Sequence, residues 1–253
     1  MLLLTHRPGP PLSRYVEALW YYDGHSAVHQ CMERVLPNGR FQIVIDLSGR
    51  SGAVCGLRSH YIAIEPAAIQ TVVGIVFRPG GARGFFSMPA SDFYNQIVPL
   101  DAVWGPWVRQ VQERLVVMIT AEGKLRALET ALLHALKSGS DAQFVLHAAV
   151  QYSLKAFRQL PHIRTVSDVA RDAGLSRRRL CQLFHEQVGM TPKLYCRLIR
   201  FRHVLRQIAD GGPIDWADVA TAGGYYDQAH LITSSGTSQA SRQALMSRRC
   251  GRP

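Results

Sequence analysis

The sequence predicts an α+β protein, with a β-rich N-terminal half followed by an all-α C-terminal half. Between residues 30 and 100, short β-branched and aromatic runs alternate with turn residues. From about residue 106, apolar residues recur every three or four positions, as in amphipathic helices. Positive charge is uneven: residues 151–253 contain 16 Lys and Arg against 7 Asp and Glu, whereas residues 1–150 contain 13 against 11. A basic C-terminal part is typical of a polyanion-binding domain.

The composition is that of a globular protein. With 253 residues, 47% of them hydrophobic and 19% charged, the chain is long enough for one large or two modest domains. No apolar run approaches the roughly 20 residues of a membrane-spanning helix. The start, "MLLLTHRPGPP", lacks the ordered regions of a secretory signal, so we expect a cytoplasmic protein without a membrane partner. Five scattered cysteines with no CxxC pair argue against a disulfide framework or a zinc site.

Three runs in the N-terminal half are predicted strands: "FQIVIDL" (41–47), "HYIAI" (60–64) and "TVVGIVF" (71–77). The turn sequences "PNG", "SGRSG" and "RPGG" separate or follow them. Short strands at this spacing favour an antiparallel sandwich or barrel, which we place in residues 1–105. Helical periodicity then predicts a linker or dimerisation segment in residues 106–158, interrupted near "KSGSD".

Residues 165–188 predict a helix-turn-helix. We expect the first helix to be capped by Ser167, the turn to be made by Ala173-Gly174-Leu175, and the second helix to be capped by Ser176. On the second helix, one face carries apolar residues for the core and the opposite face is polar. The apolar residues are Leu180, Leu183 and Phe184, and the polar ones are Arg177, Arg178, Gln182 and His185. A helix with Arg and Gln facing outward suits the major groove of DNA.

The motif is repeated about fifty residues later. A long helix with Leu194, Leu198, Phe201, Leu205 and Ile208 on one face follows the first unit. Asp168, Val169, Ala170 and Gly174 then recur as Asp218, Val219, Ala220 and Gly224, with Asp227 in the capping position. Two such units joined by one helix are suited to two successive major-groove faces of DNA.

These residues resemble the AraC/XylS family of bacterial transcription regulators. The resemblance covers residues 165–232, within a predicted DNA-binding domain of residues 159–232, and is carried by "DVARDAGLSRRRLCQLFHEQVGMTPKLYCRLIRFRHVL" and "WADVATAGGYYDQAHL". It implies a double helix-turn-helix domain that binds double-stranded DNA. The N-terminal half is similar to the sensor domains of this family through "ERVLPNGRFQIVIDL", "VVGIVFRPGGARGFF" and "MPASDFYNQIVPLDAVWG". That similarity implies a cupin-like antiparallel β-barrel that binds a small effector or dimerises.

The resemblance also implies site residues and partners. The base-contacting positions of the first recognition helix fall on Arg178, Cys181 and Gln182, with Arg177 and His185 as phosphate contacts; in the second unit they fall on Gln228 and Thr233. For each, an ordinary solvated surface side chain is the competing interpretation. In the sensor half, the candidate effector-binding residues are Arg34, Asn38, Arg40 and Arg78. The implied partners are DNA, an unidentified effector, RNA polymerase and a second copy of the chain, and most members of the family activate transcription.

The family pattern stops after residue 232. Phe184 corresponds to Ser235 and Leu183 to Ser234, and no "TP" and Tyr follow in the tail, residues 233–253. We expect a short or frayed second recognition helix and a disordered basic tail, so that the first unit carries most of the specific binding. Either the tail is out of frame with an ancestral gene, leaving a regulator with impaired DNA binding, or its basic residues make non-specific phosphate contacts.

An enzyme is the alternative from another class. His25, His29 and Glu33 have a spacing that superficially suits a metal, as in a cupin metalloenzyme, but they precede the first predicted strand and the family's metal pattern is missing. Sequences typical of a phosphate-binding loop or a nucleophile elbow do not occur. A regulator that senses alkylation needs a four-cysteine zinc cluster, which the sequence lacks. We therefore expect no enzyme activity, cofactor or metal.

Overall fold

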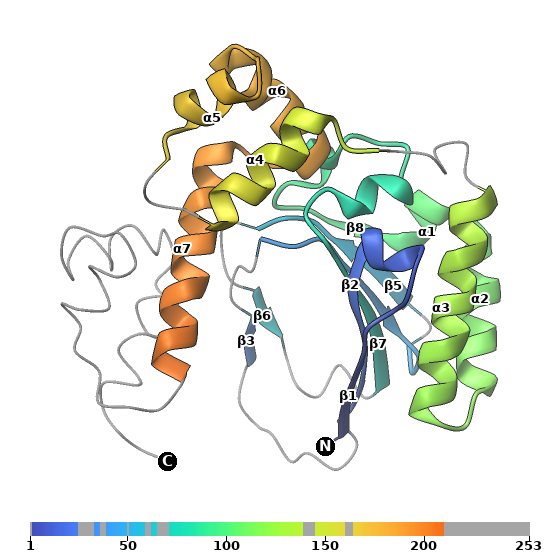
Figure 1. The fold of residues 1–253 in the computed structure, drawn as a ribbon. Helices are drawn as coiled ribbons and strands as arrows, with labels where there is room; N and C mark the ends of the chain where they lie inside the picture. The colour runs from blue at the N-terminus through green and yellow to red at the C-terminus, as the bar shows by residue number, and fades with distance from the viewer. Residues whose placement is uncertain are drawn as a thin grey trace.

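The computed structural model describes residues 2–24, 33–35, 39–49, 51–58, 62–64, 71–138, 145–159 and 164–209 (Figure 1). Its N-terminal part is an antiparallel β domain with a six-stranded sheet in the order β1-β2-β7-β4-β5-β8 and a two-stranded sheet of β3 and β6. The strands are β1 Leu2–His6, β2 Val16–Asp23, β3 Glu33–Val35, β4 Gln42–Asp46, β5 Ser51–Cys55, β6 Ile62–Ile64, β7 Thr71–Phe77 and β8 Ile97–Pro99. The predicted class, an antiparallel β domain followed by helices, is confirmed.

Strand β7 lies in the interior of the larger sheet and pairs with β2 on one side and β4 on the other. Val73, Ile75 and Phe77 on this strand are fully buried, as expected for an inner strand covered by other elements. Gly74 lies under the ring of Trp20, and a Cβ at this position would be 2.1 Å from Trp20 Cε2. The run "TVVGIVF" is therefore a strand whose glycine permits close approach of an aromatic ring.

Two strands precede the predicted β-rich range, so the start of that range at residue 30 was wrong. Strand β1 lies at the edge of the sheet, with Leu2 and Leu3 exposed, and β2 contains the near-continuous apolar run "ALWYY". Neither strand shows the regular alternation of apolar and polar residues that identifies a strand in a sequence. The predicted turn "SGRSG" lies where β4 turns into β5, and only its last two residues, from Ser51 on, belong to the strand.

Three helices follow the sheet: α1 Leu100–Trp104, α2 Trp107–Val117 and α3 Ala121–Ser138. Helices α2 and α3 lie side by side, and α3 packs against β2 and β1 (Figure 1). Lys124 of α3 is buried and donates hydrogen bonds to the carbonyl oxygens of Leu115, at 2.8 Å, and Met118, which lie at the end of α2. Burial lowers the pKa of this ammonium group. Most of the predicted helical segment thus forms a pair of helices, α2 and α3, that packs on the β domain.

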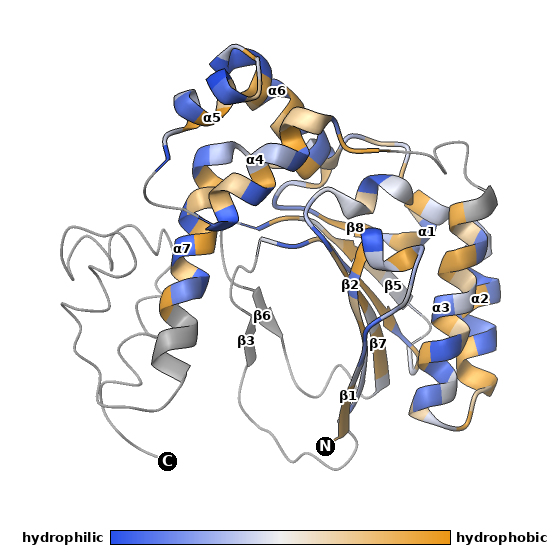
Figure 2. Cartoon of the chain, in the orientation of Figure 1, coloured by the Kyte–Doolittle hydropathy of each residue, from blue (hydrophilic) through white to orange (hydrophobic). Residues whose placement is uncertain are grey.

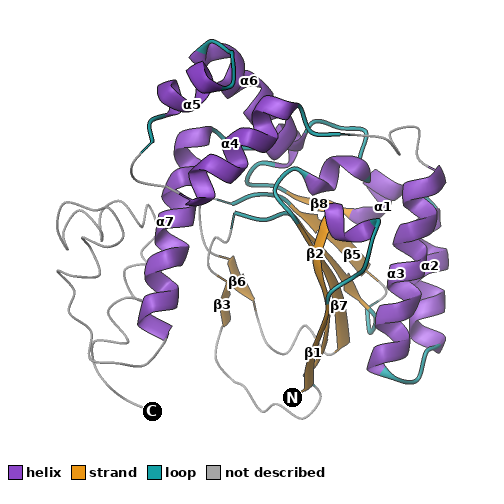
Figure 3. Cartoon of the chain, viewed as in Figure 1, coloured by secondary structure: helices purple, strands orange, loops and turns teal. Residues whose placement is uncertain are grey.

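Four helices form the C-terminal part: α4 Ala148–Gln159, α5 Val166–Asp172, α6 Arg177–Val188 and α7 Pro192–Ala209. Helix α4 contacts α5, α6 and α7, and α6 contacts the 3-10 helix η4 (Ala90–Phe93) of the β domain. Figure 3 shows the helices on two sides of the strands, with α5 and α6 farthest from the sheet. The C-terminal helices are therefore one packed group that rests on the β domain through the end of α6.

Candidate nucleic-acid interface

Helix α5 begins with a capping box. Thr165 is the N-cap: its Oγ1 accepts a hydrogen bond from the Asp168 backbone N–H at 3.1 Å, and the Thr165 N–H donates to Asp168 Oδ2 at 3.2 Å. The prediction that Ser167 caps this helix was wrong, since Ser167 lies within it. The hydrogen bonds from Thr165 lower the pKa of the Asp168 carboxyl.

Thr165 and Ser167 offer a matched test of this cap. We expect Thr165→Ala to lower the free energy of unfolding by about 0.5–2 kcal/mol, because the Asp168 backbone N–H loses its acceptor, Thr165 Oγ1. Ser167→Ala, two residues away on the same exposed turn, should change it by less than about 0.5 kcal/mol. Urea unfolding followed by circular dichroism measures both. Equal losses in the two variants would contradict the assignment of the cap.

The turn between α5 and α6 is built around Gly174. Its φ of +69° is left-handed, and a Cβ there would meet no atom within 4 Å, so backbone conformation is the reason for glycine. The Leu175 N–H donates to the Ala170 carbonyl at 2.9 Å and the Gly174 N–H to Arg171 at 3.0 Å, which ends the helix. The predicted turn at residues 173–175 is confirmed.

Helix α6 is capped by Ser176, as predicted, because its Oγ accepts a hydrogen bond from the Arg179 N–H at 3.2 Å. Its predicted apolar face is buried: Phe184 is fully inaccessible, and Leu180 and Leu183 also lie in the core. The Phe184 ring makes edge contacts with Phe157 of α4, at 6.2 Å between centroids, and with Tyr195 of α7, at 5.5 Å. These contacts fix α6 between the two neighbouring helices.

The opposite face of α6 is exposed and basic. In Figure 2 the end of α6 remote from the β domain is hydrophilic, whereas its side toward the other helices is apolar. Arg177, Arg178, Gln182 and His185 are all exposed, and Cys181 is half-buried among them. The structure therefore places the five predicted residues of the first unit on one helix, four of them exposed. A convex helix of this kind, with guanidinium and amide groups outward, can enter a groove of about 12 Å.

Two side chains on this face were not among the predicted residues. Arg179 Nη1 donates a hydrogen bond to Gln182 Oε1 at 3.0 Å, and Gln182 Nε2 donates to Glu186 Oε1 at 2.9 Å. All three side chains are exposed. The spacing of three and four residues along the helix was available in the sequence as a signal.

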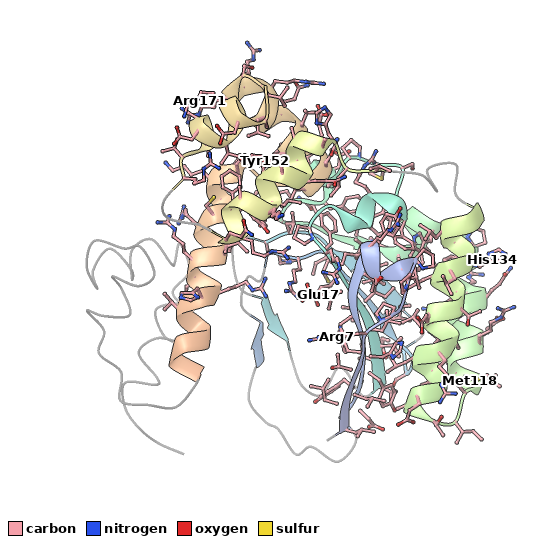
Figure 4. All side chains as sticks on the ribbon, in the orientation of Figure 1. Arg7, Glu17, Met118, His134, Tyr152 and Arg171 are labelled. Atoms are coloured by element: carbon pink, nitrogen blue, oxygen red, sulfur yellow. The ribbon has the colours of Figure 1, made fainter. Side chains whose placement is uncertain are left out.

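A second polar cluster ties α4 to the helix-turn-helix. Arg164 forms an ion pair with Asp172 and donates from Nη1 to the Tyr152 hydroxyl at 3.0 Å. The Tyr152 hydroxyl in turn donates to Asp172 Oδ2 at 3.3 Å. Tyr152 and Arg171 are labelled in Figure 4 on α4 and α5, respectively. The hydrogen bond from Arg164 lowers the pKa of Asp172, so this carboxylate stays charged beside the basic surface.

The remaining predicted contacts of the second unit, Gln228 and Thr233, lie outside the residues that the structure describes, as do the repeat of the motif and the basic tail. On α7, Leu198 and Phe201 are buried and Leu194 is half-buried, as the predicted apolar face requires. Cys196, on the same helix, is buried, and burial raises the pKa of its thiol to about 11. It is thus an unreactive core residue.

The candidate effector residues are only partly brought together. Arg40 and Arg78 lie at the same end of the sheet, where the Phe77 N–H donates to the Phe41 carbonyl at 3.0 Å. Arg40 forms an ion pair with Glu17 at 2.5 Å, and Arg78 Nε donates to the Ser13 carbonyl at 2.7 Å. Arg34 lies in β3, and Asn38 is outside the described part of the chain. Glu17, labelled in Figure 4, was missed; a lone acid in the apolar run "VEALW" was its signal.

Metal-ligating side chains and membrane-spanning helices can be assessed in the part of the chain that the structure describes. No three His, Cys, Asp or Glu side chains there are grouped so that they could hold a metal ion. None of the described helices is both long and apolar enough to cross a membrane. His25, His29 and His60 fall outside these residues.

Comparison with known proteins separates the same two parts. Residues 169–235 match the family described as a helix-turn-helix domain, and residues 4–99 match a family described as a domain of unknown function (DUF6597). No curated protein matches the chain. Among solved structures, the chain is similar to ToxT from Vibrio cholerae, with 10% identity, a TM-score of 0.44, and coverage of 92% of this chain and 93% of that one.

A second structure, of unsaturated fatty acid bound wild-type ToxT from Vibrio cholerae strain SCE256, has 9% identity, a TM-score of 0.43, and coverage of 93% and 91%. The arrangement of the C-terminal helices is given by the contacts of the chain itself. Those contacts and the matched domain define a helix-turn-helix DNA-binding protein. The matched domain is of the AraC type.

Proposed function

We propose that this regulator recognises specific DNA sequences through α6 and activates transcription when a small effector binds its β domain. The observation that carries the proposal is the exposed face of α6, where Arg178, Cys181 and Gln182 lie together with Arg177 and His185 around them. A buried opposite face holds the helix rigidly, so these side chains can be presented to DNA without reorganising the core.

Each side chain has a chemical role in this proposal. The Arg178 guanidinium suits a bidentate contact with guanine O6 and N7, and the Gln182 amide suits adenine N6 and N7. The Cys181 thiol is a poor hydrogen-bonding group, so its contact would be apolar, with a thymine methyl group. Arg177 and His185 flank these positions and would contact phosphates, which position the helix without reading sequence. Gln228 and Thr233 are the corresponding positions proposed for the second unit.

The effector is proposed to bind near the end of the sheet that carries Arg40. The Arg40 side chain is only 19% exposed and is paired with Glu17, so an anionic effector would compete with that carboxylate for the guanidinium. Gly39, next to Arg40, lies against Leu198 of α7, with 3.2 Å from a Cβ position to Leu198 Cδ1. A ligand that moved Arg40 would therefore also shift the packing of Gly39 against α7, a helix of the DNA-binding part. Arg34, Asn38 and Arg78 are the other candidates, and of these Arg78 lies at the same end of the sheet as Arg40.

The proposal is tested by sequencing genomic fragments that the protein binds, followed by affinity measurements on the enriched site. We expect one enriched motif and an affinity that falls steeply with salt. Arg178→Ala should weaken binding to the motif about 5- to 150-fold, whereas Arg109→Ala, an exposed arginine of α2 on the β domain, should leave it unchanged. Absence of a motif together with salt-independent binding would overturn the proposal. RNA polymerase and a second copy of the chain are the expected protein partners.

A further inference from the structure

We propose that Arg179 and Glu186 are specificity-determining residues that act through Gln182, by fixing which way its amide faces. This inference rests on the proposed function, because it assumes that α6 reads bases. Its starting point is the chain of hydrogen bonds from Arg179 to Gln182 and from Gln182 to Glu186, at 3.0 and 2.9 Å, along the exposed face of the recognition helix.

The chemistry of the two neighbours dictates the orientation of the amide. A guanidinium only donates hydrogen bonds, and an ionised carboxylate only accepts them. Gln182 Oε1 therefore faces Arg179, toward the start of α6, and Nε2 faces Glu186, toward its end. The reverse orientation would place the NH₂ group against the guanidinium and the carbonyl oxygen against the carboxylate. Two attractive contacts would become two repulsive ones.

An amide held in this way can still bind a base. Oε1 keeps a second lone pair and Nε2 a second hydrogen, which together suit the N6 donor and N7 acceptor of adenine. Across the major groove, N7 and N6 appear in one order when the adenine is on one strand and in the opposite order when it is on the other. A Gln182 amide of fixed orientation therefore distinguishes A·T from T·A. A freely rotating amide would accept both.

The test is selection of bound duplexes from a randomised library by four full-length proteins: the wild type, Gln182→Ala, the double variant Arg179→Met/Glu186→Gln, and a control. Methionine keeps the length of Arg179 but donates no hydrogen bond, and glutamine in place of Glu186 can face the amide either way. The control, Arg109→Met/Glu113→Gln, makes the same two changes on exposed residues of α2. Circular dichroism and thermal unfolding of each protein check that α6 is intact.

The readout is the ratio of A·T to T·A at the position whose preference disappears in Gln182→Ala. In the wild type and the control we expect a ratio of about tenfold or more. In the double variant it should fall to about twofold or less, with the preference for an adenine–thymine pair and the rest of the motif retained. A general loss of helix structure would instead weaken every position.

Three other outcomes would overturn the inference, the last of them together with the proposed function. If the double variant keeps the wild-type strand preference, Arg179 and Glu186 do not orient the amide and the inference is overturned. If Gln182→Ala changes no position, Gln182 reads no base and the inference is again overturned, while the proposed function stands on the motif itself. If the wild type enriches no motif, the proposed function fails, and the inference fails with it.

Discussion

Phe184→Ala should lower the free energy of unfolding by about 3–5 kcal/mol and abolish DNA binding. The Phe184 side chain is fully buried and touches the rings of Phe157 and Tyr195, so it joins α4, α6 and α7. Alanine would leave a cavity at the point where three helices meet. Since folded proteins are stabilised by only about 5–15 kcal/mol, this loss is a large part of the total.

Phe184→Leu is the matched control, because it retains most of the apolar volume. We expect it to cost clearly less than the alanine variant and to retain binding. Urea unfolding measures stability, and fluorescence anisotropy with a labelled duplex measures affinity. If Phe184→Ala unfolds and binds like the wild type, the helix-turn-helix does not depend on this core, and the position of α6 must be maintained in another way.

The same experiment bears on the second unit of the motif. Phe184 corresponds to Ser235, so the second unit carries a small polar residue where the first has its central aromatic ring. The match to the helix-turn-helix family extends to residue 235, just to this position. The loss measured for Phe184→Ala therefore indicates how much stability a unit of this type lacks without its aromatic residue. A loss of the expected size would support the prediction that the first unit carries most of the specific binding.

The helix-turn-helix was predictable from the sequence because its signals are local. Gly174 is needed for a left-handed turn, Ser176 for a cap, and the apolar residues of α6 for one buried face; each depends on residues close by in the chain. The first cap was placed wrongly because Thr165, Ser167 and Asp168 offered competing oxygens. Only the reciprocal bonds of the capping box identify Thr165 as the N-cap.

The β domain was less predictable because its contacts are not local. Strand β1 pairs with β2, and β2 pairs with β7 more than fifty residues later, so neither needs a regular pattern of its own. The ion pair of Arg40 with Glu17, which joins β2 to the segment before β4, is likewise a contact between residues far apart in the sequence. The contact of α6 with η4 is also a tertiary feature, and the sequence "HEQVGM" gives no sign that its glycine lies against another part of the fold.

That glycine, Gly189, carries the second large prediction. It ends α6 with a φ of +88°, and a Cβ there would lie 2.7 Å from the Ala90 carbonyl oxygen and 2.9 Å from Leu57 Cδ1. Both neighbours belong to the β domain. Alanine would be strained by about 1–2 kcal/mol from the left-handed backbone, and relief of the clash should cost about 1–3 kcal/mol more. Gly189→Ala should therefore both destabilise the protein and separate α6 from η4.

Gly174→Ala is the matched control, because it introduces the backbone strain without the clash. Gly174 also has a left-handed φ, of +69°, but a Cβ there meets no atom within 4 Å, so only the backbone strain applies. We expect the two variants to differ in stability by the cost of the clash. Hydrogen exchange should then become faster in the peptide containing Ala90 only for Gly189→Ala. Equal stability losses with unchanged exchange at Ala90 would mean that the end of α6 does not transmit movement between the β domain and the DNA-binding helices. If the exchange responds as expected, this contact couples the β domain to the recognition helix.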